Sequence, residues 1–261
     1  MKITVFTSNK KRHNYLINLL SEVSDELYVI QESDTIFPGI IPGHYQVSST
    51  MKKYFENVNK AQSHFFGNSH VNIINKKVKI LSMISGDLNK CSMNLLSDFL
   101  KSDVYIVFGS SYIKGDLVDF LVKQKAINIH AGVSPYYRGT DCNFWALYDN
   151  NPHLIGATIH LLSKGLDSGP MLYHAMSNLK TNPYEYTMST IKSAFHSIAE
   201  RINDGSIFSI KPLVQDKAKE IRYTKKSEFT EEVVKEYFEK KIDLNSKKFN
   251  NSLLKDPFFL N

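Results

Sequence analysis

The sequence predicts an α/β protein whose core is a Rossmann-like, doubly wound and mostly parallel sheet, with a small C-terminal extension. The chain opens with a strand, a polar turn, a helix and a second strand, which is how such sheets begin. A later apolar run, residues 104–108, is uninterrupted, as expected of a parallel strand buried on both faces. After Gly205 the composition changes, so we expect a main domain over residues 1–205 and an extension over residues 206–261.

The first half of the chain alternates strands and helices. We expect strands over residues 2–7, 27–30, 78–84, 104–108 and 126–130. Apolar residues at helical spacing predict helices from Tyr15 to about residue 23 and over residues 51–66, 93–100 and 117–122. Residues 33–48 contain two prolines and two glycines, which predicts an irregular excursion at the edge of the sheet.

The second half is predicted to add two antiparallel strands, over residues 156–162 and 171–175, on either side of a glycine turn. A long amphipathic helix follows over residues 184–203 and ends at Asp204-Gly205. The extension contains a linker, a basic turn at residues 222–226 and one amphipathic helix over residues 229–237. Its tail is polar and ends in Phe258-Phe259-Leu260.

The composition is that of an ordinary globular protein. Of the 261 residues, 42% are hydrophobic and 22% are charged, so the chain can bury a full core. The apolar runs are too short to span a bilayer or to form a signal segment, and we therefore expect a cytoplasmic protein without a membrane partner. Two cysteines far apart, Cys91 and Cys142, indicate neither a disulfide framework nor a metal site, and we expect no metal.

The net charge of +6 suits anionic small molecules, and it would also suit nucleic acid. The lysine pairs are scattered along the chain, however, and acidic residues lie near several of them. Scattered pairs are more typical of a solvated surface than of a nucleic-acid stripe, so we expect no nucleic-acid partner.

Three polar side chains at strand ends form the candidate catalytic group. Alternation along the strand at residues 126–130 places Asn128 and His130 on one face. Asp167 lies in the turn Gly165-Leu166-Asp167-Ser168-Gly169, after the strand at residues 156–162. An amide, an imidazole and a carboxylate can supply a donor to an oxyanion, a group that titrates near neutrality, and a group that orients the imidazole or takes a proton. The alternative is local hydrogen bonding at a strand end beside a plain turn residue.

These motifs resemble those of the folate-dependent formyltransferase family. The resemblance rests on Asn128-x-His130, on the loop Pro135-x-x-Arg138-Gly139 and on the Gly-Leu-Asp-Ser-Gly turn, and it is strongest from about residue 104 to residue 172. Residues 132–139 and 143–147 are most similar to the branch that formylates nucleotide-linked sugars.

The resemblance implies that residues 1–205 are the catalytic domain of an N-formyltransferase. Such an enzyme moves the formyl group of 10-formyltetrahydrofolate to the primary amine of a nucleotide-linked amino sugar, a precursor of a bacterial-type surface glycan. The resemblance also implies a homodimer formed through the C-terminal helices. No activated protein nucleophile is needed, because the amine itself attacks.

The resemblance also implies a role for each residue of the catalytic group. Asn128 would donate an N–H to the oxyanion, and His130 would stabilise the oxyanion as imidazolium or move the proton. Asp167 would orient His130 and accept the proton of the attacking amine. We expect His160, which alternates with Thr158 on the strand at residues 156–162, to be packed rather than catalytic.

Carried over by position, the folate pocket would be lined by Gly109, Tyr112 and Ile113. The backbone from Leu162 through Gly165 to Asp167 would bind the polar edge of the pterin. The glycine at position 109 could equally serve close helix packing.

Five further residues are assigned to the acceptor substrate. Ser8, Arg12 and His13 form a polar turn that could hold a phosphate at a helix N-terminus, the alternative being a helix cap with solvated charges. Tyr136 and Arg138 lie in the catalytic loop, where Arg138 suits a structural pair as well as a substrate contact.

Two features of the sequence bear on the acceptor. The turn at residues 7–11 lacks the glycines of the Gly-Asn-Gly-Ser-Asn turn in glycinamide ribonucleotide enzymes. The residues after Gly205 lack the alternating strands expected of the second, β-rich domain in methionyl-tRNA enzymes. An amino sugar on a nucleotide is therefore the expected acceptor, and the alternatives are a methionyl-tRNA formyltransferase-like enzyme and a folate-binding module without catalysis.

Overall fold

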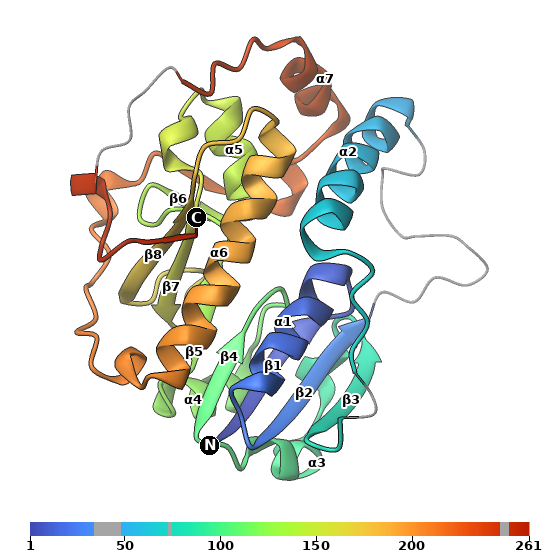
Figure 1. Cartoon of the computed structure of the whole chain (residues 1–261), viewed down its shortest axis with the longest axis vertical. Coiled ribbons are helices and arrows are strands. Elements are labelled where there is room, and N and C mark those ends of the chain that lie inside the picture. The colour runs from blue at the N-terminus through green and yellow to red at the C-terminus, as the bar shows by residue number, and fades with distance from the viewer. Residues whose placement is uncertain (34–47, 73–74, 246–250, 261) are drawn as a thin grey trace.

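The computed structural model describes residues 1–33, 48–72, 75–245 and 251–260. Within them, eight strands form one sheet in the order β10-β8-β7-β5-β4-β1-β2-β3 (Figure 1). The strands are β1 (Lys2–Ser8), β2 (Glu26–Ser33), β3 (Val78–Ile84), β4 (Val104–Val107), β5 (Ile127–His130), β7 (Ala157–Leu161), β8 (Met171–Ser177) and β10 (Phe258–Leu260). All neighbours are parallel except the pairs β5–β7 and β7–β8, which confirms the mostly parallel sheet predicted from the sequence.

Helices cover both faces of this sheet, as in a doubly wound fold. In Figure 1, α1 (Lys11–Glu22) and α6 (Pro183–Asn203) lie in front of the strands, and their buried residues share one hydrophobic cluster with the sheet. On the opposite face, α3 (Met93–Leu96) and α4 (Gly115–Lys123) bury Leu96, Leu117 and Leu121 against the sheet. Burial of a spaced apolar row on each helix, rather than intrinsic helix propensity, supplies most of the stability of such helices.

A second group of packed elements lies beyond the carboxyl end of β5. It contains α2 (Ser49–Phe66), α5 (Cys142–Tyr148) and α7 (Glu231–Glu239), together with a small parallel sheet of β6 (Tyr137–Gly139) and β9 (Arg222–Thr224). These elements share an aromatic cluster in which Phe144 and Trp145 are buried.

The structure departs from the sequence-based expectations at three places. The first helix begins at Lys11, so Arg12 and His13 lie on its first turn rather than in a polar loop. The C-terminal tail adds β10 to the edge of the main sheet, parallel to β8, and residues 222–224 pair with residues 137–139. Residues 206–261 thus contribute two strands as well as the expected helix. The excursion expected over residues 33–48 falls, apart from its two ends, outside the described residues.

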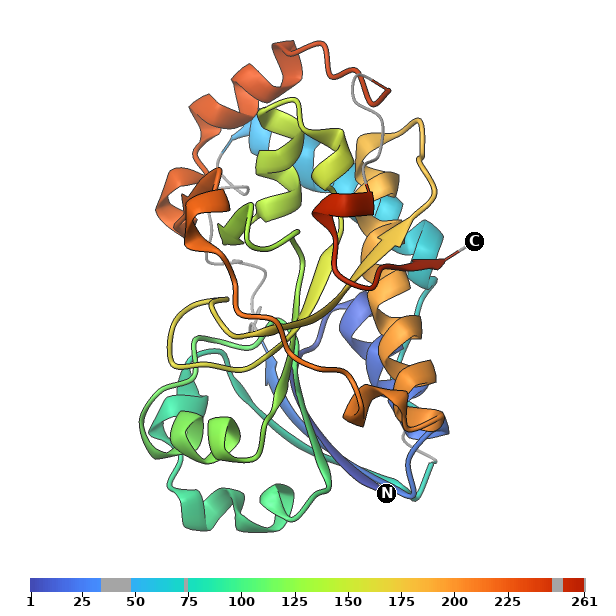
Figure 2. The same cartoon turned by 90° about the vertical axis from the view of Figure 1, so that its left-hand side faces the viewer.

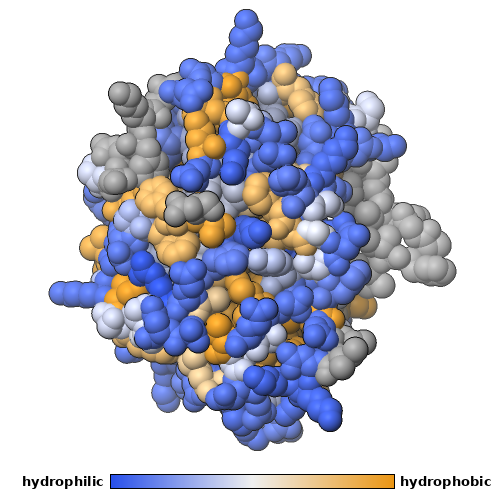
Figure 3. All heavy atoms as spheres, viewed as in Figure 1, coloured by the Kyte–Doolittle hydropathy of each residue, from blue (hydrophilic) through white to orange (hydrophobic). Residues whose placement is uncertain are grey.

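The surface seen in Figure 3 mixes hydrophilic residues with separate apolar patches. Among the helices that the structure describes, none is both long and apolar enough to cross a membrane.

Candidate active site

The register of β5 and β7 and the turn after β7 bring the candidate catalytic group together. Asn128 lies opposite His160 across the antiparallel pair β5–β7, so the two side chains stand on the same face. The chain after β7 then turns back, with Asp167 in the left-handed region at φ +46°, and carries its carboxylate to the same place. The polar cluster therefore consists of four residues: Asn128, His130, His160 and Asp167.

Asn128 uses both of its N–H donors inside this cluster. Its Nδ2 donates to Oδ1 of Asp167 at 3.1 Å and to Nε2 of His160 at 2.9 Å. Nδ1 of His160 lies 2.8 Å from the carbonyl oxygen of Leu161, which can only accept, so the proton of His160 is on Nδ1 and its Nε2 is the acceptor. In this state both Asn128 donors are engaged within the cluster, and the donation to an oxyanion stays a prediction.

His130 is buried between two acceptors. Its Nε2 lies 3.2 Å from the carbonyl oxygen of Tyr137, and its Nδ1 lies 3.4 Å from Oδ2 of Asp167. Burial lowers the pKa of His130 more than the Asp167 carboxylate raises it, so the imidazole is neutral at pH 7. The neutral ring holds its proton on Nε2, toward Tyr137, and leaves the Nδ1 lone pair facing the carboxylate.

Asp167 is ionised in this setting. Burial raises its pKa, but the electrostatic interaction with the rings of His130 and His160 and the hydrogen bonds around it lower the pKa to about 2. His160, which was expected to be packed, is buried; its Nε2 also accepts from Asn128 and lies 3.8 Å from Oδ1 of Asp167. The antiparallel register opposite Asn128 is the signal that would have identified it.

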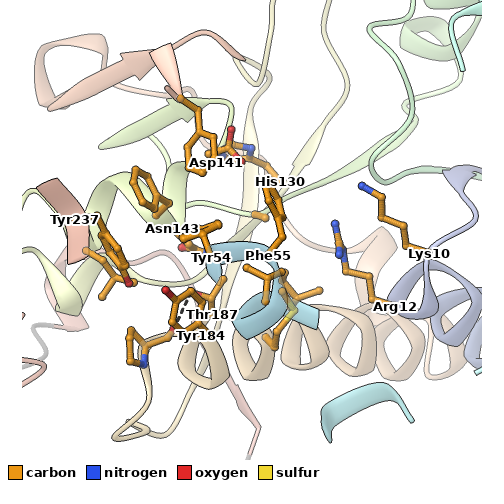
Figure 4. Close-up of a pocket in the computed structure, with 18 of the residues that line it drawn as sticks. Lys10, Arg12, Tyr54, Phe55, His130, Asp141, Asn143, Tyr184, Thr187 and Tyr237 are labelled. Atoms are coloured by element: carbon orange, nitrogen blue, oxygen red, sulfur yellow. Dashed lines mark hydrogen bonds between the residues drawn. The ribbon is translucent and has the colours of Figure 1, made fainter. Parts of the chain in front are cut away.

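The cluster opens into a cavity of about 300 Å³ through His130. In Figure 4, Lys10 and Arg12 lie on one side of His130, and an aromatic group with Tyr184 and Tyr237 lies on the other. Asp141 lines the cavity close to His130. The aromatic residues that line it are Tyr54, Phe55, Phe144, Tyr184, Phe229 and Tyr237.

Of the residues at the start of α1 that were expected to bind a phosphate, only some line the cavity. Arg12 lines the cavity and donates from Nη1 to Oε1 of Gln62 at 2.7 Å; burial lowers its pKa to about 10, which leaves it a cation. His13 was assigned wrongly. It is buried, its Nδ1 bonds Oγ1 of Thr7 at 2.8 Å and accepts from the N–H of Ser8 at 3.1 Å, and burial holds its pKa well below the usual value.

The burial of His13 also accounts for Gly109. A Cβ at position 109, where φ is +64°, would lie 2.5 Å from Cε1 of His13. The glycine therefore permits close approach of α1, which is the alternative recognised from the sequence. Ser8 is buried and does not line the cavity, whereas Lys10, which was not singled out, does.

Tyr136 and Arg138 do not reach the cavity either. Arg138 donates from Nη1 to Oε2 of Glu220 at 2.8 Å and from Nη2 to the carbonyl oxygen of Leu166 at 3.0 Å, so it is a structural pair. Tyr136 is buried, and its carbonyl oxygen accepts from the backbone N–H groups of Ile221 and Arg222. The assignment of these two residues to the acceptor stays a prediction, and neither of them lines this cavity.

The residues expected around the folate form a separate strip beside the Asp167 turn. The hydroxyl of Tyr112, which is exposed, donates to the carbonyl oxygen of Lys164 and so joins the loop after β4 to that turn. Leu162 packs against the cluster that contains Ile113, and the Ile113 side chain is itself buried. Ile113 can therefore offer a ligand only its backbone. A Cβ at Gly165 would lie 2.4 Å from Oγ of Ser168, a side chain that can rotate away, so this contact does not require a glycine.

Taken together, the fold and the cluster define an α/β protein with an amide, two imidazoles and a carboxylate at the end of its central strands. Residues 89–203, which are 115 of the 261 residues, match the model of the formyl transferase family. A methionyl-tRNA formyltransferase of Thermosynechococcus vestitus is 37% identical over 73 residues, which are 28% of this chain and 22% of that enzyme. The match thus spans about a fifth of the length of this relative.

Solved structures share the fold over most of the chain. A 4-N formyltransferase from Francisella tularensis has a TM-score of 0.53 at 17% identity, covering 87% of this chain and 77% of that one. An N-formyltransferase from Helicobacter canadensis, in complex with folinic acid and dTDP-3-aminofucose, has a TM-score of 0.52 at 12% identity, covering 90% and 79%. At identities this low, the structural similarity establishes a common fold and nothing more.

Proposed function

We propose that this protein is an N-formyltransferase that moves the formyl group of 10-formyltetrahydrofolate to the primary amine of a nucleotide-linked amino sugar. The observation that carries the proposal is the cluster of Asn128, His130, His160 and Asp167 opening into a cavity with cations on one side and aromatic rings on the other. The product would be a precursor of a bacterial-type surface glycan.

The net reaction forms a bond from the amine nitrogen to the formyl carbon, breaks the bond from that carbon to the folate nitrogen, and moves one proton from the amine to the folate. One residue that takes and returns a proton therefore suffices. We assign that role to Nδ1 of His130, because the ring is neutral at rest and its Nδ1 faces the ionised Asp167 at 3.4 Å. Once protonated, the ring can donate to both Asp167 and the Tyr137 carbonyl oxygen.

Asn128 is assigned to the negative charge that develops on the formyl oxygen. Its bond to Asp167, at 3.1 Å, is the longer of its two internal bonds, so an oxyanion can replace that one. His160 keeps the other N–H of Asn128 in place through its fixed tautomer. One such donor contributes on the order of 3 kcal/mol to the transition state in other acyl-transfer enzymes.

The cavity is assigned to the acceptor. Lys10 and Arg12 suit a phosphate of the nucleotide, and the aromatic rings suit the base or an apolar face of the sugar. The folate is assigned to the strip between Tyr112 and Gly165, which are both exposed and border the Asp167 turn. In this scheme residues 1–205 are the catalytic domain, residues 206–261 the extension, and the protein is a cytoplasmic homodimer.

A methionyl-tRNA substrate is the second candidate, favoured by the 37% identity to a methionyl-tRNA formyltransferase over 73 residues. The two acceptors differ in charge. Binding of a tRNA would weaken steeply with added salt, because many phosphate contacts release counterions, whereas a nucleotide sugar would show a shallow dependence.

The test is a turnover assay with 10-formyltetrahydrofolate and a panel of nucleotide-linked 3-amino and 4-amino sugars, following the release of tetrahydrofolate. We expect one sugar to support turnover, and we expect Asn128→Ala and His130→Ala to lose it. His70→Ala, which alters an exposed histidine, is the matched control and should keep full activity. Turnover with charged methionyl-tRNA and none with the sugars would replace the first candidate by the second. Folate binding without turnover on either substrate would leave the non-catalytic module.

A further inference from the structure

The turn that carries Asp167 is held by a segment of the chain that follows α6. Figure 2 shows this segment passing across the loop between β7 and β8. Leu213 pairs with Met171 through two backbone hydrogen bonds, of 2.7 and 2.8 Å, at the point where the loop enters β8. Two residues further on, Nε2 of Gln215 donates to the carbonyl oxygens of Asp167 and Gly169, each at 2.8 Å.

Arg138 and Glu220 hold the other side of the same turn. Arg138 donates to the carbonyl oxygen of Leu166 at 3.0 Å and is itself paired with Glu220 at 2.8 Å. Three carbonyl oxygens of the turn, those of Leu166, Asp167 and Gly169, therefore accept from side chains.

Asp167 has a conformation that needs such support. A left-handed backbone costs about 1–2 kcal/mol for a residue with a Cβ, although aspartate tolerates it better than most. The turn would therefore relax if its carbonyl oxygens lost their donors. Relaxation would move the carboxylate away from Nδ1 of His130 and from Nδ2 of Asn128, which it now contacts at 3.4 and 3.1 Å.

Gln215 is poorly explained as a purely structural residue. Both of its N–H donors go to the turn, while its Oε1 is buried without a hydrogen-bond partner. A buried acceptor left unpaired costs about 1–3 kcal/mol, and an apolar side chain of the same length would avoid that cost. What an apolar side chain could not supply is the pair of donors.

We propose that Gln215 is a positioning residue of the reaction: it fixes the backbone of the Asp167 turn so that the carboxylate meets His130 and Asn128. The inference rests on the proposed function, and it adds a residue outside the matched family region of residues 89–203. Gln215 acts through Asp167 and contacts neither substrate.

The test replaces Gln215 by methionine, which keeps length and removes both donors, and by glutamate, which keeps shape and turns acceptors toward the two carbonyl oxygens. We expect kcat to fall roughly ten- to a hundredfold in Gln215→Met, because a displacement of about 1 Å in a catalytic group costs up to about a hundredfold. The kcat of Gln215→Glu should fall at least as far as that of Gln215→Met. KM for both substrates and the melting temperature should change little. Val214→Ala, at a neighbouring position that is 77% exposed, is the control and should behave as the unaltered protein.

A double-mutant cycle separates positioning from a general structural effect. In an Asp167→Asn background, Gln215→Met should cost less than threefold in kcat, because the group it positions has already lost its charge. An undiminished effect in that background, or an unchanged kcat in the single variant, would overturn the proposal.

A second readout needs no substrate. The Asp167 carboxylate raises the pKa of His130 against the opposing effects of burial and of the neighbouring His160 and Arg138. Release of the turn should therefore lower the pKa of His130 further, which NMR titration of the imidazole resonances measures. Identical His130 titrations in Gln215→Met and the unaltered protein would refute the positioning role even if no acceptor is ever formylated. A shifted titration without turnover would uphold the positioning role and refute the proposed function.

Discussion

Asp167→Asn is the sharpest test of the assignment of the proton to His130. The change removes one negative charge that lies 3.4 Å from Nδ1 of His130 and leaves the shape of the side chain almost unaltered. At an effective dielectric constant of about 20, two unit charges at this separation attract by about 5 kcal/mol. Because an imidazolium shares its charge between two nitrogens and the new amide oxygen can still accept, we expect a loss of about 3–4 kcal/mol, or roughly 10²- to 10³-fold in kcat.

The assay is the release of tetrahydrofolate at saturating substrates, measured between pH 5 and 9. His130 works as a neutral base in this scheme, so the rate falls as the pH drops through its pKa. Asp167 raises that pKa, and its replacement should therefore move the acid limb to lower pH while the plateau falls. The control is Asp98→Asn, which alters a carboxylate that is 81% exposed. It should leave the position of the acid limb and the height of the plateau unchanged.

Two results would refute the reasoning. A kcat within threefold of the unaltered enzyme would show that the carboxylate does not stabilise a proton on His130. An acid limb that stays in place while the plateau falls would show that another group titrates. Either outcome would return the role of base to a residue outside the His130–Asp167 pair.

Three further predictions follow from the described contacts. Asn128→Ala should lower kcat about 10²-fold with little change in melting temperature, since one oxyanion donor is worth about 10²- to 10³-fold; an unchanged rate would exclude it as that donor. Gly139→Ala should destabilise the fold by more than about 2 kcal/mol in urea titrations, because its φ is +94° and the new Cβ would lie 2.0 Å from the carbonyl oxygen of Thr224. Its control is Gly205→Ala, at φ +76° with nothing within 4 Å of the Cβ, which should cost only about 1 kcal/mol. Burial lowers the pKa of His174 to about 4, so the unfolded chain binds a proton that the folded chain does not between about pH 6.5 and pH 4. Stability should therefore fall by about 3 kcal/mol as the pH drops through that window, and His174→Gln should flatten this dependence in chemical unfolding measured at each pH.

The predictable parts of the fold are those that depend on residues close together in the sequence. The strands β1, β2, β4 and β5 are apolar runs with turn residues at their ends, and each formed where the pattern placed it. The neighbourhood of Asn128, His130 and Asp167 was also predictable, because carboxyl ends of adjacent strands meet at one edge of a sheet.

The parts that were missed depend on partners distant in the chain. The strands β9 and β10 have three residues each, too few for an alternation to show, and they form because β6 and β8 offer free edges. Arg138 was ambiguous because its partner Glu220 lies 82 residues away. The error at His13 was avoidable. The residue stands three, four and seven positions before Leu16, Ile17 and Leu20, so helical spacing already placed it on the buried face of α1.

The attachment of the Asp167 turn to later parts of the chain has a consequence for synthesis. Gln215 follows Gly169 by 46 residues, and Glu220 follows Arg138 by 82. At roughly 5–20 residues per second, a ribosome needs about 2 to 9 s to deliver Gln215 after Gly169 has been made. During that interval β5, which carries Asn128 and His130, has already been made, but the Asp167 turn lacks the two N–H donors of Gln215. A nascent chain halted within this window would have the sheet without the full set of contacts to the Asp167 turn, so full activity should begin only when Gln215 arrives.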